Sequence, residues 1–551
     1  MTRLLGKLQL VSLVVILISF CATLAWAQGT VQISTDPFDN PGSQHMTEVE
    51  PHVFSFGSTV VAAFQQGRYH DGGCSDIGFA TSLDNGVSWQ HGSLPGLTIF
   101  VGGDRYLSVS DTAVAYNAAF GLWLIESLPV GGDAAIFVSR SADGVNWDFP
   151  ITANFGGGGA FYDKPWITCD NNDSSSFFGN CYIEWDSVFE GDLILMIAST
   201  DGGATWSAPL TTADGANGLG GQPLVLPNGR VVVPFRGFDG IGSFISDDGG
   251  ASWSASVEVS PLSEHGVAGD LRSPSLPSAA IDGDGTIYVA WHDCRFRPSC
   301  RANDIVISTS SDGLSWSSPL RVPTEDASGP GDFFLPGLGA NRNAFAPNVS
   351  LALVYYHYPQ ANCSQATCQL IGGFITSSDG GQTWSAPIDL TPPMALDWLP
   401  ETSSGLMVGD YFGTDFTDDG VPHPIFAAAA EPMGQFLESM FSTSVDSAER
   451  RRAEVAVASD TARVEETAEP SGLRIVAPSY RVNIGAVMQL RANGSSNQGA
   501  PISWSIEEGG AGGTVSETGL YRSPFYPGVY HIVASDGLER ARIELRVFTV
   551  R

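Results

Sequence analysis

The chain has 551 residues, more than one compact core usually holds, which indicates several domains or one repeat architecture with an appendage. Its 64 Gly, 33 Pro and 13 Trp, with only 15% charged residues, favour short strands and tight turns, so an all-β fold is expected. The formal net charge of -33 argues against nucleic acid or an anionic membrane as a partner, because phosphate groups are bound by clustered Lys and Arg.

The N-terminus is typical of a secretory signal peptide spanning residues 1–27. Positive charges at Arg3 and Lys7 precede the apolar run 8–24, and Ala25-Trp26-Ala27 follows as a cleavage site. The apolar run is short for a membrane span. We therefore expect a secreted or extracellular protein, or a periplasmic one, with no membrane span once the signal is removed.

A hairpin motif of the form Ser-x-Asp-x-Gly-x-Thr-Trp recurs along the chain, twice in a version that is one residue shorter. Its copies begin at Ser82, Ser141, Ser199, Ser246, Ser310 and Ser377. The Asp accepts hydrogen bonds from the turn, the Gly supplies a positive φ, and the Trp packs the hairpin onto its sheet. The repeated aspartates are therefore expected to be structural and not catalytic.

The motifs divide residues 28–445 into repeated units of about four strands, which is the pattern of a β-propeller. Three further strands without a motif are expected at residues 408–416, 424–430 and 439–444. Together with a strand at 30–34 they would form a seventh blade, closing the ring through the N-terminus. Six blades remain the alternative.

Six of the eight cysteines fall in close pairs, and export makes disulfides plausible. The expected pairs are Cys169-Cys181, Cys294-Cys300 and Cys363-Cys368. Cys21 falls within the predicted signal peptide, Cys74 is left over, and no Cys-x-x-Cys spacing supports zinc. No cofactor is required by the sequence, but Asp170 and Asp173 lie in an oxygen-rich loop that could hold a structural calcium ion.

The chain changes character after the propeller. Residues 446–470 are charged and Ala-rich, which indicates a linker. Residues 471–551 show short alternating strands and resemble bacterial Ig-like domains through Trp504-Ser505, Gly519-Leu520-Tyr521 and Gly528-Val529-Tyr530. This resemblance implies a small β-sandwich that serves as a spacer or adhesive appendage.

The repeated hairpin resembles the Asp-box of the sialidase and BNR-repeat superfamily. That resemblance implies a propeller which binds a sugar carboxylate with three arginines and uses a Tyr nucleophile, a Glu that activates it, and an Asp acid/base. Arg68 and Asp71 match one of the family's segments, but Val49-Glu50-Pro51 stands where the family's Arg-Ile-Pro is expected, so the first arginine is missing. Tyr411 and Glu264 are the candidates for the nucleophile and its activator by blade order.

Propeller geometry gives a second route to the site, because the start of each inner strand faces the central channel. The side chains at those positions are Glu50, His52, Asp111, Asp163, Lys164, Gln222, Arg272, Asp410 and Tyr411. In this hypothesis Asp71 works with Tyr411 or Asp163 as acid and base, while Arg68, Arg272 and Lys164 bind the sugar.

The sequence favours a glycan-directed propeller, a sialidase-like glycoside hydrolase whose substrate need not be sialic acid. An extracellular glycan or glycoconjugate is the expected partner. A non-catalytic carbohydrate- or protein-binding propeller with an Ig-like spacer is the first alternative. A polysaccharide lyase using His52, Lys164 and Tyr411 is the second.

Overall fold

The computed structural model describes residues 30–443 and, with gaps, residues 473–548. Contacts divide the chain into two units, Met1–Glu449 and Arg450–Arg551. The predicted signal peptide and linker lie outside the described residues. Within the described part of the chain, no helix is long and apolar enough to span a membrane.

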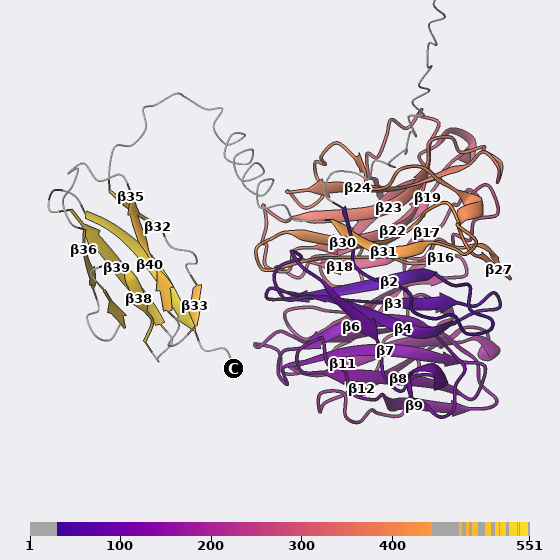
Figure 1. The fold of residues 1–551 in the computed structure, drawn as a ribbon, viewed down its shortest axis with the longest axis horizontal. Coiled ribbons are helices and arrows are strands. Elements are labelled where there is room, and N and C mark those ends of the chain that lie inside the picture. The colour runs from indigo at the N-terminus through magenta and orange to yellow at the C-terminus, as the bar shows by residue number, and fades with distance from the viewer. Residues whose placement is uncertain are drawn as a thin grey trace, which may run out of the picture. The chain divides into compact units, whose positions relative to one another are not determined.

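The first unit is built from antiparallel strands, and most of its sheets repeat one order from an inner to an outer strand (Figure 1). The inner strands are β2 (Glu48–Phe56), β6 (Ser108–Asn117), β10 (Tyr162–Cys169), β14 (Leu224–Val225), β18 (Ser278–Ile281), β22 (Asp332–Ala340) and β29 (Gly413–Phe416). The second strands are β3 (Thr59–Arg68), β7 (Leu122–Val130), β11 (Cys181–Ser187), β15 (Val231–Gly237), β19 (Ile287–Asp293), β23 (Leu351–Tyr358) and β30 (Pro422–Ala429).

The third strands are β4 (Cys74–Ser82), β8 (Ala134–Ser141), β12 (Leu193–Ser199), β16 (Gly240–Ser246), β20 (Asp304–Ser310), β24 (Gln369–Ser377) and β31 (Glu438–Thr443). The outer strands are β5 (Gln90–Ser93), β9 (Ile151–Gly157), β17 (Val257–Pro261), β21 (Leu320–Arg321), β25 (Ile388–Asp389) and β1 (Thr30–Gln32). Short strands β13 (Gly218–Leu219), β26 (Met394–Ala395), β27 (Glu401–Thr402) and β28 (Gly405–Leu406) complete the unit, with 3-10 turns at Ile99–Val101, Val188–Glu190, Pro298–Cys300 and Leu396–Trp398.

The inner strands form a closed ring. In chain order each contacts the next, and β29 contacts β2. Figure 1 shows the orange strands β30 and β31 beside the indigo strand β2. Residues of β2, β10, β18, β22 and β29 line one central channel, so the unit is a β-propeller.

The first described strand, β1, is the outer strand of the last sheet. β1 pairs with β31, with Val31 opposite Ser442, and β31 continues through β30 to β29. The strand predicted at the mature N-terminus therefore adds to a sheet formed by the end of the propeller. Its position covers an edge that would otherwise expose unpaired backbone groups.

Each Asp-box follows a third strand, since β4, β8, β12, β16, β20 and β24 all end on the first Ser of the motif. In the third copy, Asp201 accepts hydrogen bonds from the Thr205 amide at 2.9 Å and the Ser199 hydroxyl at 2.9 Å. The Gly203 amide donates to the same Ser199 hydroxyl at 3.0 Å. The carboxylates are thus used inside the turn, as the motif predicts.

Disulfides join Cys169 to Cys181, Cys294 to Cys300 and Cys363 to Cys368, which confirms the predicted pairing. Cys74 is a buried free thiol. The first bridge connects the end of β10 to the start of β11 and so closes the loop between them.

The second unit is also formed of strands: β32 (Arg474–Val476), β33 (Arg481–Asn483), β34 (Val487–Gln489), β35 (Arg491–Asn493), β36 (Ser503–Ile506), β37 (Thr514–Val515), β38 (Leu520–Arg522), β39 (Gly528–Ser535) and β40 (Arg540–Phe548). One sheet has the order β33-β40-β39-β36 and another β34-β38-β37. Leu490, Tyr521, Ile532 and Leu545 are buried in its core.

Candidate active site

A pocket of about 210 Å³ opens at the end of the propeller where the inner strands begin. Its lining includes Glu50, Arg68, Asp71, Ser110, Asp111, Phe161, Asp163, Lys164 and Arg272. Apart from Asp71, the carboxylates and the lysine come from the inner strands β2, β6 and β10. Arg68 ends β3, Asp71 follows it, and Arg272 lies in the loop between β17 and β18. The sequence-predicted ring of polar side chains is therefore largely brought together here.

Irregular backbone lies at the same level of these strands. Register shifts occur between Val49 and His52 in β2 and between Asp163 and Trp166 in β10. Inside these shifts, Glu50 has φ 55 and Lys164 has φ 49, a region that L-residues rarely occupy. A proline follows each of them in the sequence.

Asp111 in β6 repeats the arrangement, with φ 28 between Ser110 and Thr112. Bulges of this kind re-aim side chains that strand alternation would place elsewhere. Strained non-glycine residues gathered at one pocket are also a recognised feature of functional sites.

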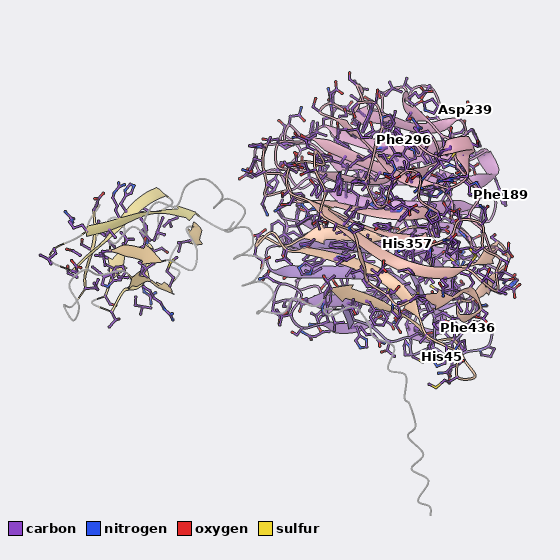
Figure 2. All side chains as sticks on the ribbon, turned by 90° about the horizontal axis from the view of Figure 1, so that it is seen from above. His45, Phe189, Asp239, Phe296, His357 and Phe436 are labelled. Carbon is purple, nitrogen blue, oxygen red and sulfur yellow. A yellow bond between two sulfur atoms is a disulfide. The ribbon has the colours of Figure 1, made fainter. Side chains whose placement is uncertain are left out.

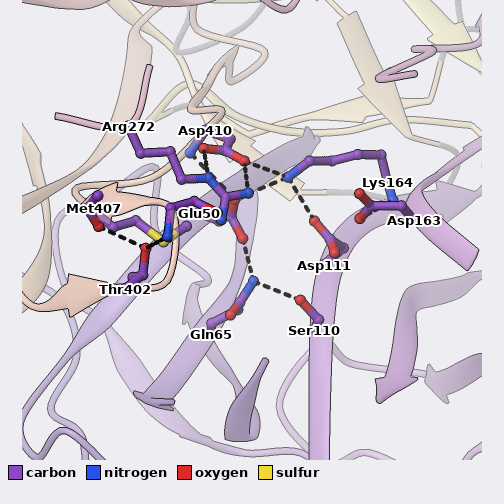
Figure 3. A network of polar contacts seen from close by, with 12 residues as sticks. Glu50, Gln65, Ser110, Asp111, Asp163, Lys164, Arg272, Thr402, Met407 and Asp410 are labelled. Carbon is purple, nitrogen blue, oxygen red and sulfur yellow. Dashed lines mark hydrogen bonds and ion pairs between the residues drawn. The ribbon is translucent and has the colours of Figure 1, made fainter. Parts of the chain in front are cut away.

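Lys164 is the centre of a buried ionic network (Figure 3). Its Nζ lies 3.1 Å from Glu50 Oε1, 3.1 Å from Asp111 Oδ1 and 2.9 Å from Asp410 Oδ2. Its side chain is 5% exposed. Burial lowers the pKa of the ammonium, but the surrounding carboxylates outweigh burial and raise it well above its usual value. Lys164 therefore stays charged.

Asp410 joins Lys164 to Arg272. The Arg272 Nε donates to Asp410 Oδ1 at 2.8 Å, and Nη2 donates to Oδ2, which makes a bidentate pair. Burial opposes ionisation of Asp410, but the two cations prevail and hold its pKa below the usual range. Asp410 lies behind the pocket and orients both cations.

Asp163 is half-buried in the pocket wall. Burial is the main reason that its pKa is raised to about 6, and the nearby carboxylate of Asp111 adds to the effect. The pKa of Glu50 is raised to about 7, again mainly by burial. Carboxyl groups with such values can hold and release protons near neutral pH.

Arg68 and Asp71 occupy the rim on the β3 side. Arg68 is buried, and its guanidinium donates to the Gly73 carbonyl and lies 3.3 Å from the Met407 sulfur. The Asp71 carboxylate is 91% exposed and lies 2.6 Å from His70 Nδ1. Asp71 is therefore free to meet a ligand that enters from solvent.

Besides Asp410, three predicted site residues do not line this pocket: Tyr411, His52 and Glu264. The Tyr411 hydroxyl accepts a hydrogen bond from the Thr112 amide at 3.0 Å, and its ring packs edge-on against Trp166. His52 lies deeper in the channel, where its Nδ1 accepts from the Val114 amide at 2.9 Å. Burial lowers the pKa of His52 to about 3.

Glu264 is the third. It lies between β17 and β18 and forms an exposed ion pair with Arg236 at 3.2 Å. The structure thus does not join Glu264 to Tyr411, and the Tyr and Glu pair that the family resemblance implies is not assembled from these two residues.

In the loop predicted to hold calcium, a carboxylate oxygen of Asp170 forms a hydrogen bond within the loop. Asp170 is buried and its Oδ1 accepts from the Asn172 amide at 2.9 Å, while Asp173 is exposed. Within the described ranges, no three His, Cys, Asp or Glu side chains are grouped so that they could hold a metal ion. A calcium ion at Asp170 and Asp173 stays a prediction without geometric support.

Two polar residues of the site, Gln65 and Ser110, were not identified from the sequence. Gln65 in β3 donates from Nε2 to the Glu50 carboxylate and to the Ser110 hydroxyl, the latter at 3.3 Å. Gln65 and Gln66 interrupt an apolar run, and two successive amides in a buried strand are the signal that could have shown them.

The BNR/Asp-box repeat family model matches residues 244–255, which contain the fourth Asp-box. No curated protein sequence matches the chain. Among solved structures, a protein of unknown function from Dyadobacter fermentans is 16% identical, with 64% of this chain and 100% of that chain covered and a TM-score of 0.40.

Two glycosidases are also similar. A sialidase from Streptococcus pneumoniae is 14% identical, with 76% of this chain and 71% of that chain covered and a TM-score of 0.38. An α-L-arabinofuranosidase from Fusarium graminearum is 15% identical, with 63% and 97% covered and a TM-score of 0.39. Neither likeness identifies a substrate or a catalytic residue in this chain.

Proposed function

We propose that this chain, a BNR/Asp-box repeat protein of the sialidase-like β-propeller superfamily, is a secreted glycoside hydrolase whose active site is the pocket around Lys164. The observation that carries the proposal is the carboxyl pair Asp111 and Asp163 in one pocket wall. Glycoside hydrolysis needs one carboxylic acid to protonate the leaving oxygen and a second, ionised carboxylate.

Asp163 is the proton donor in this proposal. Its pKa of about 6 leaves it largely protonated in mildly acidic solution. Asp111, ion-paired to Lys164 at 3.1 Å, is the second carboxylate. Lys164 and Arg272 are then positioning residues, because the Asp410 carboxylate holds both cations in place.

The proposed substrate is an uncharged sugar. Lys164 and Arg272 are already paired with carboxylates, and Glu50 adds a further acid to the lining. An anionic sugar would have to displace these internal pairs. The overall charge of -33 also disfavours an anionic ligand.

The architecture proposed around this site has seven blades. It is supported by the ring of seven inner strands and by the closure of the last sheet by β1. For residues 471–551 we propose an Ig-like spacer, supported by the three small sheets described in that unit. Secretion is supported by the three disulfides, which persist in oxidising compartments.

The test is hydrolysis of a panel of neutral aryl glycosides and one aryl sialoside by the full chain. We expect turnover of a neutral glycoside and loss of that turnover in Asp163→Asn and Asp111→Asn. Glu264→Gln, outside the pocket, is the control and should leave the rate unchanged. Absence of turnover on every glycoside would overturn the enzymatic proposal.

A non-catalytic saccharide-binding propeller is the second candidate. It is favoured by Tyr411, whose hydroxyl is already bonded to the Thr112 amide. Retained saccharide binding by the wild-type chain without any turnover in the same panel would support this alternative.

A further inference from the structure

A second pocket of about 240 Å³ lies at the opposite ends of the inner strands. Phe54 and Phe56, at the end of β2, line it, whereas Glu50, near the start of β2, lines the first pocket. A strand rises about 3.3 Å per residue, so the six residues from Glu50 to Phe56 span roughly 20 Å. The two pockets are therefore separate sites at the two mouths of the channel. We propose that this second pocket binds a neutral saccharide, independently of the chemistry at the first.

An aromatic platform stands at this mouth. The Phe56 side chain is 42% exposed, and its ring stacks on Tyr116 with centroids 4.1 Å apart and planes inclined by 29°. Tyr116 thereby fixes one face of Phe56. A sugar ring carries an apolar face of C–H groups, and such a face packs on an exposed aromatic ring.

The platform is held by a bridged loop. Asn171, in the loop closed by Cys169 and Cys181, donates from Nδ2 to the Tyr116 carbonyl at 2.8 Å and accepts from the Ala118 amide at 2.8 Å. The backbone of Tyr116 is therefore tied to the loop. A platform that is ordered before binding loses less entropy when a ligand arrives.

Beside this platform, Asn343 and Asp418 supply polar groups from the loops that follow β22 and β29, and the Asp418 amide donates to the Gly57 carbonyl at 3.1 Å. Both are exposed, and Asn343 Nδ2 donates to Asp418 Oδ1 at 2.9 Å. An amide and a carboxylate together provide donors and acceptors, which is the combination that sugar hydroxyls need. Asn172 adds a further amide to the lining.

The charge balance selects a neutral ligand. Arg342 is the one basic residue among those lining this pocket, and it is bound to Asp415 at 2.9 Å and to the Ser55 carbonyl at 2.7 Å. Its guanidinium also lies 4.2 Å from the centre of the Phe54 ring. Asp282 and Asp418 line the same pocket, so an anion would meet more negative than positive charge.

The experiment is hydrogen exchange of the full chain, followed by mass spectrometry, with and without soluble oligosaccharides. The probes are β-1,4-gluco-, β-1,4-xylo- and α-1,5-arabino-oligosaccharides, with sialyllactose as the anionic comparison. We expect a neutral probe to slow exchange in peptides that contain Asn172, Gly283 and Asn343. Peptides that contain Gly72 and Asp163 report the first pocket, so failure of either site is seen separately.

Affinity measurements on variants complete the test. Phe56→Ala and Asn343→Ala should each weaken binding of the neutral probe roughly ten-fold. Phe238→Ala is the matched control. Phe238 is 74% exposed on the hairpin between β15 and β16, and its replacement should leave binding of the neutral probe unchanged. The proposal is overturned if no neutral probe slows exchange at this mouth, if sialyllactose protects it more strongly, or if neither variant weakens binding.

Discussion

The Lys164 ammonium and the Asp410 carboxylate lie 2.9 Å apart, although 246 residues separate them in the sequence. Both side chains are nearly inaccessible, at 5% and 1% exposure. Asp410 lies three residues before the start of β29, the inner strand that contacts β2, so this ion pair links β10 to the segment that leads into β29. One buried network therefore joins the pocket to the segment that leads into β29.

Replacing Lys164 by methionine should be strongly destabilising. The variant keeps the length of the side chain but leaves the carboxylates of Glu50, Asp111 and Asp410 without their shared cation. Breaking a buried ion pair by removing one partner costs about 3–5 kcal/mol. Urea denaturation of wild type and Lys164→Met measures this difference in the free energy of unfolding.

The free energy of unfolding that Lys164→Met loses should depend on pH. Glu50 has a pKa of about 7, so in mild acid it takes up a proton and becomes neutral. Removal of the Lys164 cation then leaves one buried negative charge fewer without a partner. The destabilisation should therefore be larger at about pH 8 than at about pH 5. Arg230→Met is the control, because its ion pair with the 58% exposed Asp247 is worth about 0–1 kcal/mol. Equal losses in the two variants would contradict the proposed importance of the network.

Glu48 should make the propeller more stable in mild acid than at neutral pH. It is fully buried, and burial raises its pKa from 4.5 to about 7 despite hydrogen bonds from Gln66, Ser34 and the Met440 amide. The folded state therefore holds a proton that the unfolded state releases above its own pKa. Stability from this group is fully present below about pH 4.5 and is lost as pH rises through about 7, by up to about 3 kcal/mol.

Glu48→Gln should flatten the fall in unfolding free energy between about pH 5 and pH 7, because the amide cannot titrate. Glu258→Gln, which changes an exposed side chain on β17, should keep the wild-type slope. Denaturation curves across this pH range provide the measurement. A wild-type stability that rises from pH 5 to pH 7, with the same slope in Glu48→Gln, is the contrary result.

The repeated fold was readable from the sequence because its cause is local. Each Asp-box forms hydrogen bonds within its own turn, as Ser199 and Asp201 do, so each of the six short segments predicts one hairpin without reference to the rest of the chain. The cysteine pairs were readable for the same reason, since the loops that they close are short. The pairing of β1 with β31 needed only the count of strands left without a motif.

The site was readable only in part. Ring geometry selected Glu50, Lys164 and Arg272, and the structure places all three in the pocket lining. The ion pairs that these residues form could not be predicted, because bulges at positive φ change the direction of the side chains and the alternation of residues along a strand does not show where such bulges lie. The sequence predicted Tyr411 as a nucleophile at the pocket, but its hydroxyl is bonded to the Thr112 amide. That contact could not be predicted because Thr112 is distant in the sequence.

The third Asp-box should contribute stability and no catalysis. Asp201→Ala removes the acceptor for the Thr205 amide and for the Thr205 and Ser199 hydroxyls. We expect a loss of about 1–3 kcal/mol, because hydrogen bonds to a charged group are worth that order. Glycoside turnover by the folded protein should be unchanged.

Asp239→Ala is the matched control for this change. Asp239 is an exposed aspartate on the hairpin between β15 and β16 (Figure 2), away from any Asp-box. Thermal denaturation should show a lower midpoint for Asp201→Ala and no change for Asp239→Ala. A catalytic defect in folded Asp201→Ala would show that the repeated aspartates do more than hold turns.

Asp163 should set the alkaline limit of activity. As a proton donor it must be protonated, and with a pKa of about 6 its protonated fraction falls about ten-fold per pH unit above that value. The rate kcat/KM on the best neutral glycoside should therefore fall above about pH 6. Asp163→Asn should lower kcat about 10²- to 10⁴-fold on glycosides with poor leaving groups and remove this limb of the profile.

Substrates with different leaving groups can show whether Asp163 donates a proton or has only a structural role. A dinitrophenyl glycoside departs without much help from an acid, so Asp163→Asn should retain more of its activity on that substrate than on an alkyl glycoside. A variant that was simply misfolded would lose both activities equally. If both substrates lose the same factor while the unfolding curve is unchanged, Asp163 is not the acid, and the second carboxyl group of the wall, Asp111, has to be tested in that role by the same comparison.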